Sequence, residues 1–412
     1  MRSNPASVND QHGSENPTPS RSSALIALLA LSQATLPLSL DLTLPATPEV
    51  ARQLGADQAS IQTIFSGFLI VFGCGQLIWG PIGDRFGRKG PWLAGSLFFI
   101  LGCAGCALSN STAALLSARL LQAFGACSAM VLGSAMVRDL YFGAEEVRLR
   151  SLLMLLGSAI PISAPLLGGQ IVTYSNWRDI FWTQAAIGVV MLVLVARSME
   201  SLPSEKRVRP KATEMALNYA RLLANRRYLG GTLTGTFMSS SYIAYLTASP
   251  FVYIQYFKVT PQTFGWFTAI NIAGMMLGSA LGRKLVNQYG PARLLLTGVV
   301  IGTFSSFWLL IVGLTGWHGL ISIIPPIFLC STIVGVTNPN AIAIALSHFP
   351  ESAGAAAAMF GALIMGVGGL AGALVGLWAD GTPLAMAKVM ALFSMLGLVS
   401  FLFLLKTPSG KK

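Results

Sequence analysis

Twelve long apolar runs, separated by short polar loops, constrain this chain more than any other feature of its sequence. A bilayer core about 30 Å thick requires about 20 apolar residues for each helix that spans it. Only 10% of the 412 residues are charged, against about 25% in an ordinary soluble domain. The runs lie at roughly residues 24–46, 60–82, 91–109, 113–137, 150–173, 179–197, 229–253, 262–285, 293–314, 318–347, 354–378 and 384–405. The sequence therefore predicts an all-α polytopic membrane protein with twelve transmembrane helices.

A long charged connection between the sixth and seventh runs divides the chain into two sets of six helices. The strings GPIGDRFGRKGP (80–91) and GRKLVNQYGPAR (282–293) follow the second and eighth runs and form a weak repeat, which favours two pseudo-symmetric bundles. The predicted organisation is a disordered cytoplasmic tail (1–20), an N-terminal bundle (21–198), a cytoplasmic central loop (199–227), a C-terminal bundle (228–406) and a second cytoplasmic tail (407–412).

Positive charge is distributed unevenly between the two sides of the membrane. The net charge is +12, and about 22 of the 27 Lys and Arg residues fall in the tails and the even-to-odd loops. Arg52, Arg178, Lys258 and Lys388 fall on the other side, and Arg119 falls inside a run. The positive-inside rule then predicts that both termini lie in the cytoplasm. A nucleic-acid partner is not expected, because no basic patch interleaved with aromatic residues is present.

Residues that could carry enzyme or metal chemistry are sparse. All five cysteines lie inside apolar runs, where they act as small hydrophobic residues. Cys103 and Cys106 form a CxxC string, but no further metal ligands lie nearby in the sequence. The histidines, His12, His318 and His348, lie in a tail and at two loop edges, with no acid pair or nucleophile motif beside them. We therefore expect neither an enzyme, nor a metal site, nor a cofactor.

Two charged residues lie inside apolar runs, Asp41 in the first and Arg119 in the fourth. An ionised carboxylate facing lipid costs at least about 2.5–3.5 kcal/mol, so Asp41 must face a cavity or be protonated, and either condition makes it a candidate proton carrier. The alternative is that Asp41, between Pro37 and Pro45, caps a kinked helix end near the outer face. Arg119 stays charged and needs an anion, carbonyl groups or water around it. Its alternative role is snorkelling or structural pairing.

The string GPIGDRFGRKGP joins the second and third runs. Its glycines supply the backbone freedom that a sharp turn requires, and its acid among basic residues suits a cytoplasmic latch that forms in one state and breaks in another. The alternative is an ordinary positive-inside anchor loop. The predicted gate residues are Gly80, Gly83, Asp84, Arg85, Gly87 and Arg88.

Two further groups of residues are candidates for transport. In the fifth run, Pro161 and Pro165 interrupt helical hydrogen bonds, and Gly168 and Gly169 permit close approach of another helix. The alternative is that these glycines only form a small-residue stripe for helix packing, as in any membrane bundle. Polar and aromatic residues within the later spans are candidates for a substrate cavity, and each is alternatively a structural hydrogen-bond partner. These residues are Tyr242, Tyr245, Asn271, Asn338 and Asn340.

Several of these strings resemble the major facilitator superfamily and, within it, the twelve-span drug:proton antiporters. GPIGDRFGRKGP resembles the superfamily's signature loop between helices two and three. RLLQAFGA is similar to the helix-four motif whose arginine, here Arg119, is implicated in proton transfer. PISAPLLGG resembles the antiporter motif of helix five, with Ala164 where that motif usually has glycine. SLDLTLPATP, VRDLY, SPFVYI, TFGWFTAINI and NPNAIAIALSHFPESAGAAAA resemble the bicyclomycin-resistance subgroup.

The resemblance implies the major facilitator fold and a function in export. It implies that two states expose one site alternately to each side, and that antibiotics of the bicyclomycin, chloramphenicol or sulfonamide kind leave in exchange for protons. By the same resemblance, Asp41 is the proton-coupled acid of helix one. Export of a physiological metabolite and proton-coupled import are the alternatives. We expect a monomer without cofactors, driven by the proton gradient, whose partners are a small-molecule substrate, protons and the lipid bilayer.

Overall fold

The computed structural model of the chain describes residues 23–198, 212–316, 319–347, 349 and 352–405. Within these ranges the chain forms helices, turns and no β-strand. The first part contains α1 (Ser23–Leu40), α2 (Thr47–Gln53), α3 (Gln58–Phe86), α4 (Lys89–Leu108), α5 (Thr112–Leu140), α6 (Gly143–Tyr174) and α7 (Trp177–Ser198). The second contains α8 (Ala212–Ala224), α9 (Arg226–Pro250), α10 (Pro261–Tyr289), α11 (Pro291–Thr315), α12 (Leu320–Leu346), α13 (Ala353–Leu377) and α14 (Leu384–Ser400).

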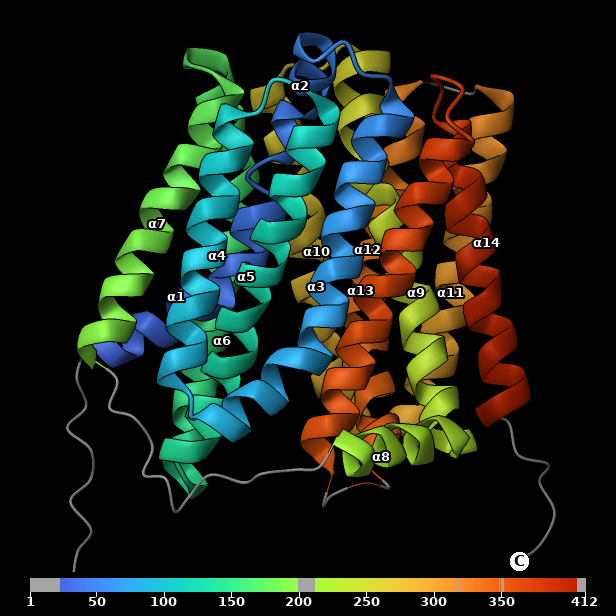
Figure 1. Cartoon of the computed structure of the whole chain (residues 1–412). Coiled ribbons are helices and arrows are strands. Elements are labelled where there is room, and N and C mark those ends of the chain that lie inside the picture. Colours follow the sequence, from blue (N-terminus) through green and yellow to red (C-terminus); the bar gives the residue numbers. More distant parts are fainter. Residues whose placement is uncertain (1–22, 199–211, 317–318, 348, 350–351, 406–412) are drawn as a thin grey trace, which may run out of the picture.

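Twelve of these helices are long and run roughly parallel to one another, whereas α2 and α8 are short and lie at opposite ends of the bundle (Figure 1). We call these the α2 end and the α8 end. α1 to α7 form one half of the molecule and α9 to α14 the other, with α3 and α13 adjacent between them. The predicted tails, and residues 199–211 of the predicted central loop, lie outside the described residues.

The hydropathy of the helices agrees with a membrane location. In the described part of the chain, ten helical segments are long and apolar enough to cross a membrane. α6 and α9 are not among the ten, although they contain 32 and 25 residues. α9 is rich in Thr, Ser and Gly, and it packs against α12, α13 and α14, so that polar side chains such as those of Thr234 and Ser240 are buried in its own half. The predicted twelve-helix fold is confirmed.

Local sequence signals set the beginnings of several helices. The Asp57 carboxylate accepts a hydrogen bond from the Ser60 amide at 2.9 Å and begins α3. Ser111, Asn225 and Thr260 cap α5, α9 and α10 in the same way. Side chains of this kind satisfy amide groups that have no partner within the helix.

The first apolar run is not one continuous helix, as its predicted range of 24–46 required. α1 ends at Leu40, a turn follows, and the 3₁₀ helix η1 (Leu44–Ala46) leads into α2. Pro37 lies within the last turn of α1 and Pro45 within η1. Proline lacks an amide hydrogen and interrupts helical hydrogen bonding, which accounts for a break at this place.

The two halves meet along two seams, α3 against α13 and α6 against α10. Glycines allow the backbones to approach closely. A Cβ atom at Gly73 of α3 would lie 2.8 Å from the carbonyl oxygen of Ala362, and one at Gly265 of α10 would lie 2.9 Å from the carbonyl oxygen of Pro165. Both distances are too short for a side chain, so the seams depend on small residues, as close helix packing in membranes generally does.

Candidate functional site

Asp41 lies in the turn after α1, at the break before η1. Its side chain is only 8% exposed. Its amide donates a hydrogen bond to the Pro37 carbonyl at 2.8 Å, but its carboxylate makes no hydrogen bond or ion pair with any described residue. The side chain therefore caps no helix end in the described structure.

The segment around Asp41 contacts both halves of the molecule. η1 packs against α6 of its own half and against α9 and α10 of the other half. The Asp41 carboxylate is an electrostatic neighbour of the Tyr242 hydroxyl on α9. A Cβ atom at Gly168 of α6 would overlap the carbonyl oxygen of Leu42. Asp41 is thus buried where the halves meet, and its role as a proton carrier stays a prediction.

Arg119 is fully inside the N-terminal half, with 2% of its surface exposed. Its Nη1 atom donates to the Ser39 carbonyl at 3.0 Å and to Oε1 of Gln122 at 2.8 Å. Its guanidinium carbon lies over three phenylalanine rings. The distances to the ring centroids are 4.6 Å for Phe68, 5.4 Å for Phe65 and 5.6 Å for Phe181. Cation–π contacts of this kind stabilise a desolvated cation.

The Arg119 network holds the carboxyl end of α1. Gln122 donates to Oε1 of Gln184 at 2.6 Å, and Gln184 donates to the Leu38 carbonyl at 2.8 Å. Because the last carbonyls of a helix lack helical partners and carry partial negative charge, a cation and an amide beside them are favourable. An anion, carbonyl groups or water are the expected partners of Arg119, and the structure shows carbonyl and amide oxygens. Within the described residues, Arg119 forms no ion pair with Asp41.

At the α8 end, Asp84 and Arg88 of the predicted gate form an ion-pair network with Asp139 of α5. Arg88 bonds the carboxylates of Asp84 at 2.7 Å and of Asp139 at 2.8 Å, and Arg88 is 6% exposed. Gly87 ends α3 with φ of +85°, a conformation that glycine adopts without strain. Arg85 instead lies over the ring of the exposed Phe86.

The remaining gate glycines lie on α3. A Cβ atom at Gly83 would meet the side chains of Leu132 and Arg88, whereas Gly80 has nearly open space beside it. The network of Asp84, Arg88 and Asp139 lies within one half in the described structure, and a state-dependent latch stays a prediction.

The α6 candidates lie at the second seam. α6 continues through Pro161 and Pro165 without ending. Gly168 packs on the break after α1, and a Cβ atom at Gly169 would lie 2.6 Å from the carbonyl oxygen of Pro261, at the start of α10. These glycines therefore contact backbone in both halves of the molecule. The contact connects the break beside Asp41 to the inter-half seam.

The five candidate cavity residues of the C-terminal half form one cluster of three residues, Tyr242, Tyr245 and Asn271, while the side chains of Asn338 and Asn340 have other contacts. Asn271 donates to the Tyr245 hydroxyl at 2.9 Å, and the ring centroids of Tyr242 and Tyr245 are 5.7 Å apart. Asn338 accepts from Ser239 at 3.2 Å, and Asn340 donates to the carbonyl of Val336 in its own helix. Tyr245, Asn271, Asn338 and Asn340 thus have structural hydrogen bonds.

A cavity of about 550 Å³ opens between the halves at the α8 end, a size suited to a small organic molecule. Its lining includes Gln76, Asp84, Arg88, Ser134, Tyr219 and Ala357, and none of the five candidates above. Burial and the Asp84 carboxylate raise the pKa of the Tyr219 hydroxyl on α8. A second cavity of about 500 Å³ lies at the α2 end, lined by Gln58, Ala59, Tyr256, Lys258, Gly376 and Ala379.

Sequence reasoning missed four polar residues that the structure places in the ion-pair network, in the Arg119 network and in the α3–α13 seam. Asp139 is part of the string VRDLY, whose resemblance gave no role to the acid. Gln122 and Gln184 extend the Arg119 network, and Gln62 is fully buried on α3. Each glutamine was visible as a polar residue within an apolar run, the same signal that identified Asp41 and Arg119.

Two sets of six long helices that meet along glycine seams beside a cavity form an architecture that many secondary transporters share. The sequence profile of the Major Facilitator Superfamily matches residues 29–374. An uncharacterized MFS-type transporter, YdgK, of Bacillus subtilis (strain 168) is 32% identical over 400 residues, which cover 96% of this chain and 99% of that protein. The bicyclomycin resistance protein homolog of Haemophilus influenzae is 28% identical over 375 residues, which cover 89% and 92%.

A solved structure of a D-xylose-proton symporter superposes with a TM-score of 0.74 at 14% identity, covering 93% of this chain and 97% of that one, and so shows a shared fold. The chain belongs to the Major Facilitator Superfamily. Its resemblance to the bicyclomycin-resistance subgroup is confirmed, and its family and fold are those of membrane transporters.

Proposed function

We propose that this chain is a proton-coupled antiporter that exports small drug-like compounds by alternating access. The carrying observation is the Asp41 carboxylate, buried at a helix break between the two halves without a hydrogen bond or ion pair among the described residues. Similarity to a bicyclomycin resistance protein homolog and to a chloramphenicol resistance protein supports compounds of those two kinds as substrates, and the proposal extends to sulfonamides. No cofactor is required, because the proton gradient drives the exchange.

The proposed orientation places the α8 end in the cytoplasm of a bacterial inner membrane. The four basic residues predicted outside, Arg52, Arg178, Lys258 and Lys388, belong to or adjoin the segments at the α2 end. α1 begins and the last helical segment ends at the α8 end (Figure 1), so the proposed orientation assigns both of these helix ends to the cytoplasmic side. The cavity at that end would receive substrate from the cytoplasm, and a single chain would suffice.

Coupling follows from the cost of burying a charge. In the described structure Asp41 has no cation or donor beside it, so its neutral form fits this state better than its ionised form. Loss of the proton requires access of water or a cation to the carboxyl group. Each proton moved inward through 100 mV releases about 2.3 kcal/mol, which is available to drive export.

The test compares proton movement in inside-out membrane vesicles that contain the native chain, Asp41→Asn or Asp57→Asn. Asp57 is an exposed acid that caps α3, and asparagine caps equally well, so Asp57→Asn is a matched control. Adding chloramphenicol, bicyclomycin or a sulfonamide should release protons from the vesicle lumen with the native chain and the control, and not with Asp41→Asn.

Each other result has a definite meaning. A native-like response of Asp41→Asn would remove Asp41 from the coupling mechanism. Acidification of the lumen on adding substrate would indicate symport instead of antiport. If none of the three antibiotic classes caused proton movement, the result would favour a metabolite exporter.

A further inference from the structure

One face of α3 carries a polar and small-residue stripe along the seam with α13. Gln62, Ser66, Gly73 and Gln76 recur at helical spacing, which places them on one face. Each lies against a matching part of α13. A Cβ atom at Gly376 would lie 3.2 Å from Gln62, and one at Gly372 would lie 3.0 Å from the Ser66 hydroxyl. Toward the α8 end, Gln76 lies against Gly361.

Gln62 and Ser66 are buried in this seam. Gln62 is 0% exposed and Ser66 2% exposed. Among the residues that the structure describes, neither the Nε2 nor the Oε1 atom of Gln62, nor the Ser66 hydroxyl, has a hydrogen-bond partner. Buried polar groups without partners are unfavourable, because they lose hydrogen bonds to water and gain none. The described state therefore carries a free-energy cost at the α2 end of the seam.

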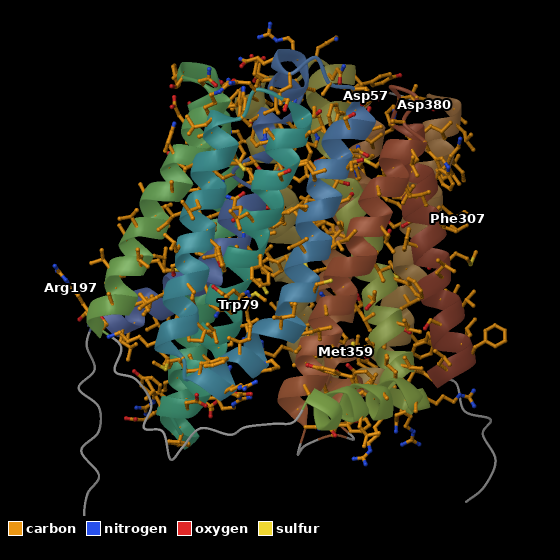
Figure 2. All side chains as sticks on the ribbon, in the orientation of Figure 1. Asp57, Trp79, Arg197, Phe307, Met359 and Asp380 are labelled. Carbon is orange, nitrogen blue, oxygen red and sulfur yellow. The ribbon has the colours of Figure 1, made fainter. Side chains whose placement is uncertain are left out.

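The two ends of the stripe differ in access to solvent-filled space. Gln76 lines the 550 Å³ cavity at the α8 end. At the other end, Ala59 and Gly376 line the 500 Å³ cavity, and Gly376 is also the glycine that faces Gln62. Figure 2 shows that Asp57, at the start of α3, and Asp380, just after α13, lie together at the α2 end. Separation of α3 from α13 here would open the seam directly into that cavity.

We propose that Gln62 and Ser66 form a polar gate at the α2 end of the α3–α13 seam. In the closed gate they are desolvated, which biases the transporter toward opening at this end. In the open gate they are hydrated and present amide and hydroxyl groups to a neutral, hydrogen-bonding substrate that leaves past them. The proposal rests on the alternating access of the proposed function and not on its proton coupling.

A purely structural role gives a different expectation. An unpartnered hydroxyl inside one half should cost the same in every state, because that half moves as a unit. Ser96 on α4 provides such a group, since it is 0% exposed and its hydroxyl has no hydrogen-bond partner in the described part of the chain. Ser96→Ala is thus a matched control for Ser66→Ala.

The experiment measures the width of the α2-end cavity as the distance between two spin labels, determined by electron paramagnetic resonance. Spin labels at Gln58→Cys and Ala379→Cys lie on opposite halves of this cavity, in a Cys74→Ser background that removes the exposed native thiol. The full chain is reconstituted in liposomes without antibiotic or proton gradient. Relative to the native chain, Gln62→Leu should raise the ratio of short to long distances by about tenfold, and Ser66→Ala should raise it less.

A second variant tests the opposite direction. Gln62→Glu places an ionisable group in the closed seam. As pH rises, the ionised acid requires water, which only the open gate supplies, so the fraction of molecules with the long spin-label distance should increase. Unchanged ratios in both Gln62→Leu and Gln62→Glu, or an equal rise in Ser96→Ala, would overturn the gate. Failure of proton release in the vesicle assay, with these distance shifts intact, would overturn the antiport and leave the gate.

Discussion

The two halves of the molecule differ in where they bury charge. Among the described residues, the buried charged side chains are Asp41, Arg88 and Arg119, all in the N-terminal half. The described residues of the C-terminal half bury no Asp, Glu, Lys or Arg, and their interior polar groups are neutral, as in the pair of Tyr245 and Asn271. In the proposed mechanism, the N-terminal half would therefore respond to protons, while the C-terminal half would supply a neutral hydrogen-bonded frame.

The strongest test of this comparison is Arg119→Leu. The change removes two charge-assisted hydrogen bonds, to the Ser39 carbonyl and to Gln122, and should lower stability by about 2–4 kcal/mol. Thermal unfolding in detergent measures it, and vesicle transport should be lost because the end of α1 beside Asp41 is no longer held. Arg119→Lys should restore little, since lysine lacks the planar fork and ring stacking. Full activity in Arg119→Leu would contradict the holding role.

Substitution at the seam beside Asp41 should have the next largest effect. Gly168→Ala places a methyl group against the Leu42 carbonyl and should cost about 1–3 kcal/mol through overpacking. The control is Gly157→Ala on the same helix, where a Cβ atom makes only an ordinary 4.0 Å contact. Thermal unfolding and vesicle proton release should both fall for Gly168→Ala and stay near native for Gly157→Ala. Equal behaviour of the two variants would show that the contact is unimportant.

Tyr245→Phe tests the neutral frame of the C-terminal half. It removes the hydroxyl that accepts from Asn271 and should lower stability by about 1 kcal/mol. The number of protons released per substrate should not change. A changed ratio would mean that the C-terminal half takes part in proton coupling, and the comparison between the halves would no longer hold.

The smallest expected effect on stability is that of Asp84→Asn at the α8 end. Asp139 keeps its bond to Arg88, so the loss should stay below about 1 kcal/mol. Exchange between states, followed with the spin-label pair described above, should slow more than equilibrium binding of antibiotic weakens. Weakened binding with unchanged exchange would refute the latch.

The fold could be predicted largely from sequence, and the contacts of the site could not. A spanning helix needs only length and apolar composition, and both are properties of a continuous segment. Even so, the break after Leu40 was visible only as Pro37 and Pro45, which indicate a kink and not the end of a helix.

The partners of Arg119 depended on distant parts of the chain. Ser39 is 80 residues away from Arg119, and Gln184 lies 62 residues from Gln122. No local pattern specifies such pairs, because they exist only once α1, α5 and α7 have packed together. The sequence indicated which side chains needed partners but not which groups would serve.

The glycine seams also limit how such a transporter diversifies. Along α3 and α13 the backbones touch so closely that an added methyl group at Gly73 or Gly369 would collide with the opposite helix. Sequence drift at these positions is therefore restricted, whereas the open wall around Gly80 has room for larger side chains. For the proposed exporter, new substrate ranges should accordingly arise from changes in the cavity walls, with the α3–α13 seam left constant.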